Sequence, residues 1–195
     1  MKSGMMTDKL GFTLIELLIV VSIMALLTVF GLLGFQNFNK SQSLKIAAGE
    51  LKANLRFAQN SALSGVASTI SCSDVTRAGG LFKGYQAIFT QGDKTYKIVE
   101  KCGTPTGSGV IDGVLRTYTL PNIDGITIGS VNPFANSSPT CGGNLCILFA
   151  PVNQGVQFVP DPGESTSNAT VTLHGAASGD YQIVVTKTGN IYETK

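Results

Sequence analysis

The polarity of the chain changes along its length, and the first stretch is an apolar run with one charge. From Phe12 to Phe35 the only charged side chain is that of Glu16. The run is roughly 24 residues long, which is enough for a helix to cross a bilayer. A carboxylate inside such a run costs on the order of 2–3 kcal/mol, so Glu16 is expected to have a partner. An ordinary secretory signal, with an apolar region of about 7–15 residues, fits this pattern less well.

The second stretch, residues 36–65, repeats apolar residues at helical spacing. These residues are Leu44, Ala48, Leu51, Leu55, Ala58 and Ala62. The spacing is typical of a helix that packs one face on a neighbouring element. Gly65 then supplies a stop signal. We therefore predict one helix from Phe12 to about Ser64, apolar all round in its first half and amphipathic in its second.

The amphipathic stretch is also basic. It carries Lys40, Lys45, Lys52 and Arg56 against the single acid Glu50. Two interpretations remain open: contact with anionic lipid headgroups, or a solvated helix face.

The third stretch, residues 66–195, consists of short runs rich in Val, Ile and Thr, separated by turn residues. The strand-like runs are Val66–Cys72, Tyr85–Phe89, Thr95–Cys102, Leu115–Leu120, Ile126–Val131, Leu145–Phe149, Val156–Phe158, Ala169–His174 and Tyr181–Thr186. Turns are predicted at 91–94 and 188–190, and surface loops at Gly103–Gly113, Asn132–Gly143 and Pro160–Asn168. The profile predicts an antiparallel sheet domain, and hence an α+β fold in which the long N-terminal helix packs on a β-rich head.

A short polar leader precedes the apolar run and carries Lys2 and Lys9. It ends in Gly11, followed by Phe12-Thr13-Leu14-Ile15-Glu16, and this combination resembles the class III signal of type IV pilins and type II secretion pseudopilins. In that family a prepilin peptidase cuts after the glycine, here Gly11, and methylates the new N-terminal residue, here Phe12. The resemblance implies a leader (1–11), a transmembrane half-helix (12–35), an amphipathic half-helix (36–65) and a head (66–195).

The charges of the leader also predict the membrane topology. Lys2 and Lys9 favour a cytoplasmic N-terminus, which places the head outside. We expect a single-pass protein of the bacterial inner membrane with a periplasmic or extracellular head. Cleavage after Gly11 would leave a charged amine on Phe12, one helical turn from Glu16. Pairing of Glu16 with the Phe12 amine of the next subunit would neutralise both charges, so we predict that Glu16 is an assembly contact.

Later segments resemble H-type minor pseudopilins and FimT-like minor pilins. They are Leu55–Ala62, Ile147–Gly155, Ala169–Leu173 and Tyr181–Val185. This resemblance implies a minor pseudopilin of the type II secretion pseudopilus, which acts in protein secretion by filament assembly. Its partners would be other pilins or pseudopilins, the prepilin peptidase, an assembly platform protein and an ATPase. The alternative is a minor pilin of a type IV pilus, with a role in pilus biogenesis or DNA uptake.

All cysteines lie in the part expected to be exported, where an even number predicts disulfides. Of the three possible pairings we favour Cys141–Cys146, because the Gly-Gly-Asn-Leu insert suits a tight loop, and by elimination Cys72–Cys102. Zinc binding by Cys141 and Cys146, with His174 as a helper, is the rival interpretation.

The sequence shows no metal-ligand cluster, phosphate-binding loop or nucleophile motif. We therefore expect no catalytic residue, metal or cofactor, and we interpret His174 as a structural strand residue. Asp161 and Glu164 are a weak signal for calcium. DNA binding is not expected, because no arginine follows Arg116 and phosphate binding needs several convergent cations.

Overall fold

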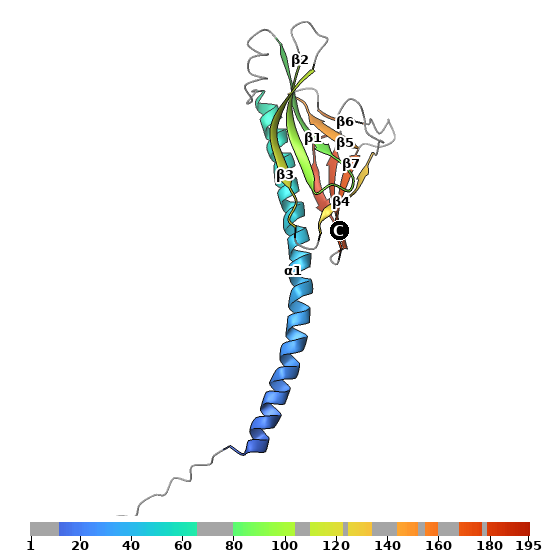
Figure 1. Cartoon of the computed structure of the whole chain (residues 1–195). Helices are drawn as coiled ribbons and strands as arrows, with labels where there is room; N and C mark the ends of the chain where they lie inside the picture. Colours follow the sequence, from blue (N-terminus) through green and yellow to red (C-terminus); the bar gives the residue numbers. More distant parts are fainter. Residues whose placement is uncertain are drawn as a thin grey trace, which may run out of the picture. The chain divides into compact units, whose positions relative to one another are not determined.

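The structure is a computed structural model that describes residues 12–65, 80–103, 110–122, 125–133, 144–151, 155–159, 168–176 and 179–195. The chain forms two compact units, Met1–Asn39 and Lys40–Lys195. Helix α1 (Leu14–Ser64) contributes to both units, and every strand belongs to the second (Figure 1).

Helix α1 ends at the predicted glycine. The backbone φ of Gly65 is +68°, a conformation that costs glycine little and other residues more. The Gly65 N–H donates to the carbonyl of Ala62 over 3.1 Å, which closes the last turn. The predicted helix is therefore confirmed, with a start two residues later than expected, at Leu14.

The predicted apolar stripe is the buried face of α1 within the second unit. Its buried residues are Leu44, Ala47, Ala48, Leu51, Leu55, Ala58 and Ala62, none more than 1 % exposed. Only Ala47 was absent from the predicted set. The helical spacing of apolar residues was thus sufficient to identify the face that packs on the sheets.

Five strands form one antiparallel sheet in the order β3-β2-β1-β5-β6. They are β1 (Leu81–Phe89), β2 (Thr95–Gly103), β3 (Val110–Thr119), β5 (Leu145–Phe149) and β6 (Val156–Val159). The predicted turn at 91–94 joins β1 to β2, with Gly92 at a φ of +87°.

The remaining strands form a second antiparallel sheet in the order β4-β7-β8-β9. They are β4 (Thr127–Asn132), β7 (Asn168–Gly175), β8 (Gly179–Thr186) and β9 (Ile191–Thr194). The predicted turn at 188–190 joins β8 to β9, and the Gly189 N–H donates to the Thr186 carbonyl over 2.9 Å.

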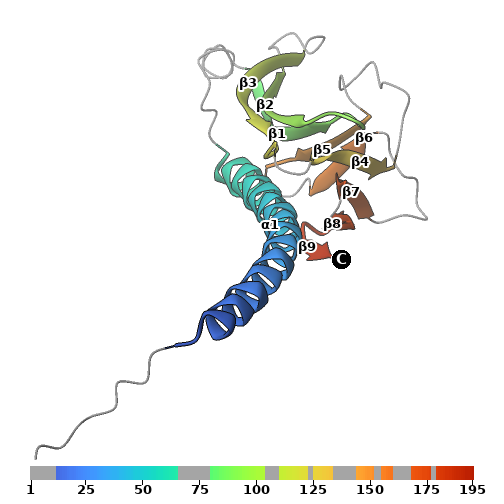
Figure 2. The same cartoon turned by 60° about the horizontal axis from the view of Figure 1, so that its bottom comes forward.

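The core of the second unit lies between α1 and the inward faces of both sheets (Figures 1 and 2). Phe89 and Ile98 enter it from the five-stranded sheet, and Leu173 and Ile183 enter it from the four-stranded sheet. Backbone hydrogen bonds also join the sheets, because the turn after β1 exchanges two of them with Ile128 of β4, at 2.8 and 2.9 Å. The predicted α+β architecture is confirmed, and the strands that the structure describes form two sheets.

One polar contact fixes the helix against the aromatic part of this core. The side-chain amide of Asn54 donates to the hydroxyl of Tyr96 over 2.7 Å. The Tyr96 ring stacks between Phe89 and Tyr118, with centroid distances of 5.6 and 5.1 Å. Burial of the phenol raises the pKa of Tyr96 to about 12, an effect that the Asn54 hydrogen bond partly opposes.

The expected loop at Gly103–Gly113 is too long, because β3 begins at Val110. The residues that start this strand include Asp112 and Gly113, which weaken the strand signal in the sequence. Pairing with β2 overrides that preference, since Ile111 lies opposite Cys102 and Asp112 opposite Lys101. The predicted strand Val66–Cys72 and most of the other two predicted loops lie outside the described residues.

Candidate processing and assembly site

The start of α1 is fixed by a side chain that the sequence analysis did not single out. Thr13 lies just outside the helix, and its Oγ1 accepts a hydrogen bond from the Glu16 N–H at 3.3 Å. The Thr13 carbonyl accepts the first intrahelical bond, from the Leu17 N–H at 3.2 Å. Thr13 is therefore the N-cap of α1. The Thr-x-x-Glu pattern of a capping box was the signal that could have identified it.

Glu16 lies in the first turn of α1, and its side chain is exposed. A carboxylate is favoured there because the helix N-terminus carries partial positive charge. Within the described residues, this carboxylate forms no hydrogen bond or ion pair, although the Glu16 N–H is bound by Thr13. The Glu16 carboxylate is thus available to a partner that lies outside these residues.

The surface on both sides of Glu16, from Phe12 to Val29, is apolar and exposed. The large hydrophobic residues with exposed fractions between 47 % and 83 % are Phe12, Leu14, Ile15, Leu17, Leu18, Ile19, Val20, Val21, Ile23, Met24, Leu26, Leu27 and Val29. Two hydroxyls interrupt this surface, and both are satisfied within the helix. Ser22 donates to the Leu18 carbonyl and Thr28 to the Met24 carbonyl, each over 2.8 Å.

The membrane assignment of residues 12–35 remains a prediction. In the portion of the chain that the structure describes, no helix is both long enough and apolar enough to cross a bilayer. The predicted cleavage site is described on one side only: Phe12 is non-helical and its side chain is 83 % exposed, whereas Gly11 lies outside the described residues.

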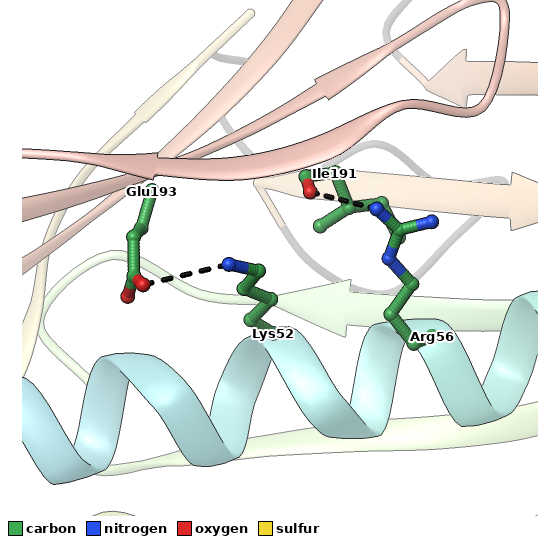
Figure 3. Close-up of polar contacts among 4 residues, drawn as sticks. All are labelled: Lys52, Arg56, Ile191 and Glu193. Atoms are coloured by element: carbon green, nitrogen blue, oxygen red, sulfur yellow. Dashed lines mark hydrogen bonds and ion pairs between the residues drawn. The ribbon is translucent and has the colours of Figure 1, made fainter.

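Part of the basic stretch of α1 binds the last strand of the chain, a role that the sequence analysis did not anticipate. Arg56 donates to the Ile191 carbonyl over 3.0 Å, and Lys52 Nζ lies 3.4 Å from Glu193 Oε1 (Figure 3). One turn further on, Gln59 Nε2 donates to the Gly189 carbonyl over 2.8 Å. We call Lys52, Arg56 and Gln59 the helix clamp. Their i, i+4, i+7 spacing puts them on one side of α1, but nothing in the sequence identified the strand they meet.

Both cysteines in the described residues, Cys102 and Cys146, are buried and disulfide-bonded. They are not bonded to each other, because Cys102 lies opposite Phe82 and Cys146 opposite Ile88 along β1. Six residues of strand separate these positions by about 20 Å, and a disulfide needs Cα atoms within about 7 Å.

The strand register therefore removes one of the three possible cysteine pairings. The predicted partners, Cys72 and Cys141, lie outside the described residues, so Cys72–Cys102 with Cys141–Cys146 stays a prediction. The remaining alternative joins Cys72 to Cys146 and Cys102 to Cys141.

His174 forms a cross-strand pair on the second sheet. Its Nδ1 lies 2.6 Å from Asp180 Oδ1, His174 and Asp180 are opposite each other on β7 and β8, and both side chains are exposed. No group of three potential metal ligands occurs in the described ranges. The suggested calcium ligands Asp161 and Glu164 lie outside those ranges.

Residues 6–32 match the family model described as the prokaryotic N-terminal methylation motif. The matched segment contains Gly11, Phe12, Thr13 and Glu16, and the match is consistent with a type IV pilin-like protein. The match also implies processing by a prepilin peptidase and assembly with other pilins. Neither the curated proteins nor the solved structures include a significant match to the chain.

Proposed function

We propose that this chain, which carries a class III prepilin signal at residues 6–32, is a minor pseudopilin of a type II secretion system. It acts in protein secretion as a structural subunit of the pseudopilus, and assembly rather than catalysis is its activity. The observation that carries the proposal is the exposed Glu16 carboxylate, without a partner among the described residues, at the start of a helix with an exposed apolar surface.

The apolar surface of α1 accounts for storage of the subunit before assembly. Thirteen large hydrophobic side chains between Phe12 and Val29 are exposed, and water would oppose that exposure at about 25 cal/mol per Å². Because Ser22 and Thr28 satisfy their hydroxyls within the helix, lipid is a suitable environment for this segment. We propose that it anchors the subunit in the inner membrane, with the N-terminus cytoplasmic and the head outside.

The Glu16 carboxylate accounts for the transfer from lipid into a filament. After processing, Phe12 would carry a free, methylated amine at the start of the chain. A pair between Glu16 and the Phe12 amine of the next subunit gains about 4 kcal/mol at ~4 Å and an effective dielectric near 20. Desolvation offsets part of that gain. Because only one stagger brings the two charges together, the pair also sets the axial register. An assembly platform and an ATPase would supply the extraction.

The charges of the head do not favour DNA binding. In the described ranges its cations are dispersed: Lys94 donates to Asn122 over 3.2 Å, and Arg116 lies 5.8 Å above the Tyr118 ring. DNA affinity needs several cations that converge on the phosphates. We therefore favour secretion over DNA uptake, and a minor pilin of a type IV pilus remains the second candidate.

Mass spectrometry of the membrane-extracted protein tests the family-level part of the proposal. The mature chain should begin with N-methylated Phe12, and Gly11→Ala should retain the leader. An N-terminus within residues 25–36 would contradict the proposal, because it would indicate ordinary signal peptidase.

Deletion of the gene for this chain, in a host that carries both a type II secretion system and type IV pili, tests which of the two systems the chain serves. Loss of extracellular protein with surface pili intact is the expected result. Loss of pili or of transformation, with secretion intact, would favour the minor pilin.

A further inference from the structure

We propose that the outer edge of β6 is a strand-addition site, where an extended segment of a partner protein joins the five-stranded sheet as a further strand. The partner segment carries apolar residues on one face and acidic residues on the other. The inference goes beyond the proposed function, because it concerns the head alone and holds for a pseudopilin or a pilin. Its basis is a comparison of the edges of the two sheets that the structure describes, which are β3, β6, β4 and β9.

Both edges of the four-stranded sheet are occupied by other parts of the head. On β4, Ile128 donates its N–H to the Asp93 carbonyl over 2.9 Å and accepts the Gly92 N–H over 2.8 Å. On the β9 side, the helix clamp donates to the carbonyls of Gly189 and Ile191. These contacts use backbone groups that an added strand would need, so neither edge is open to a partner.

The β3 edge of the five-stranded sheet carries features that discourage pairing. The strand has a β-bulge, because Arg116 lies opposite Ile98 whereas Val114 lies opposite Val99. It also carries charges at Asp112 and Arg116. Bulges and charged residues are the devices by which edge strands avoid pairing with another chain.

The β6 edge has neither a cover nor such a device. Its sequence is Val-Gln-Phe-Val, and it pairs with β5 without a register shift. The Ala150 N–H donates to the Gly155 carbonyl over 3.1 Å, so Gly155 faces β5. By the alternation of an antiparallel strand, Val156 and Phe158 then direct their N–H and C=O groups away from β5. In the described ranges, no hydrogen bond reaches these four outward groups.

The surface beside β6 indicates the chemistry of the partner. A hollow of about 340 Å³ is lined by the four residues of β6 and by Lys187. A second hollow, of about 450 Å³, continues from Val156 toward Leu63 and Pro151. Most of these side chains are apolar, whereas Lys187 is an exposed cation. An added strand gains affinity from backbone hydrogen bonds and specificity from its alternate side chains. Apolar residues suit the hollows, and acidic residues complement Lys187.

The test measures amide exchange with water by NMR in the detergent-solubilised full chain. The probe is a synthetic heptapeptide of alternating valine and glutamate, capped at both ends. With the peptide at about ten times its dissociation constant, the amides of Val156 and Phe158 should exchange about tenfold more slowly, because most chains are then bound. The amides of Thr117 and Thr119, on the outer edge of β3, are the matched control and should not change.

Two further comparisons separate strand addition from general adhesion of the peptide. The same heptapeptide with N-methyl groups on two successive central residues lacks a donor on each edge, and it should bind about fivefold or more weakly. Gln157 is exposed, so its substitution changes the charge beside the peptide without disturbing the core. Gln157→Lys should bind the peptide about two- to fivefold more tightly than wild type, and Gln157→Glu more weakly by a similar factor.

Three results would each overturn the inference. The first is the absence of slowed exchange at Val156 and Phe158 with roughly 1 mM peptide, a concentration that detects even weak binding. The second is equal binding of the N-methylated peptide. The third is the same affinity for Gln157→Lys and Gln157→Glu.

Discussion

The helix clamp should hold β9 with a strength that differs among its three residues. Arg56 donates a charged hydrogen bond to the Ile191 carbonyl at 3.0 Å, and Ile191 is only 2 % exposed. Such a bond contributes about 2 kcal/mol. Gln59 makes a neutral bond of 2.8 Å to the Gly189 carbonyl, which contributes about 1 kcal/mol. Lys52 and Glu193 form an exposed pair at 3.4 Å, which is worth less than about 0.5 kcal/mol.

Methionine at each position keeps the aliphatic stem and removes the polar contact. Hydrogen exchange of the β9 amides in the detergent-solubilised chain reports the free energy of local opening. The exchange rate rises about tenfold for each 1.4 kcal/mol of stabilisation that is lost. Exchange should accelerate about 30-fold in Arg56→Met, about fivefold in Gln59→Met and no more than about twofold in Lys52→Met. Lys45→Met is the matched control, because Lys45 is an exposed cation of the same helix for which the described residues show no partner.

Arg56 and Gln59 should not act independently. Their side chains lie 3.5 Å apart, from the guanidinium to Oε1, so the double variant should lose less than the sum of the single losses. An unchanged exchange rate in Arg56→Met, or a larger effect from Lys52→Met, would refute the proposed order of contributions.

Three further predictions concern assembly, alkaline stability and the disulfides. Glu16→Ala and Glu16→Gln should be processed and inserted normally, but they should be poorly represented in sheared filaments. The control Glu50→Gln should be incorporated as well as the wild type. Wild-type incorporation of the Glu16 variants would rule out an assembly contact. The pKa of Tyr96 is about 12 in the folded protein, whereas an unfolded chain has the ordinary value near 10. The folded state therefore gains stability from the neutral phenol, fully below pH 10, and loses it as the pH rises toward 12. Urea midpoints between about pH 8 and pH 11 should therefore fall less steeply in Tyr96→Phe, and equal slopes would contradict the assignment. Non-reducing peptide mapping should recover Cys72–Cys102 and Cys141–Cys146, whereas a fragment that joins Cys72 to Cys146 would establish the other pairing.

The sequence predicted elements that depend on local pattern. The apolar stripe from Leu44 to Ala62 correctly predicted the buried face of α1. Helical periodicity can be recognised in the sequence without knowing which element packs on that face. The turns at Gly92 and Gly189 followed from residues that accept a positive φ. Gly11, Phe12 and Glu16 came from a motif of about ten residues, which the match at 6–32 covers.

The elements that the sequence analysis missed depend on contacts between distant segments. The division of the strands into two sheets follows from which edges meet, for example β1 with β5 and β4 with β7. The start of β3 at Val110 depends on its partner strand. The helix clamp likewise depends on a contact with a distant segment. In the sequence its residues have the polar character of ordinary surface positions on a helix, and only the structure shows that they contact the segment 189–193.

The helix clamp also has a consequence for the order of events during biogenesis. Arg56 and Ile191 are 135 residues apart in the chain, and Lys52 and Glu193 are 141 apart. Contacts at such separation form late, because the intervening chain must first be brought together. The segment between Arg56 and Ile191 contains strands β1 to β8, so β9 should pack on α1 after the rest of the head has formed. A chain in which β9 does not form should therefore keep the buried stripe of α1 packed on the sheets and lose only the contacts of Arg56 and Lys52 with this strand.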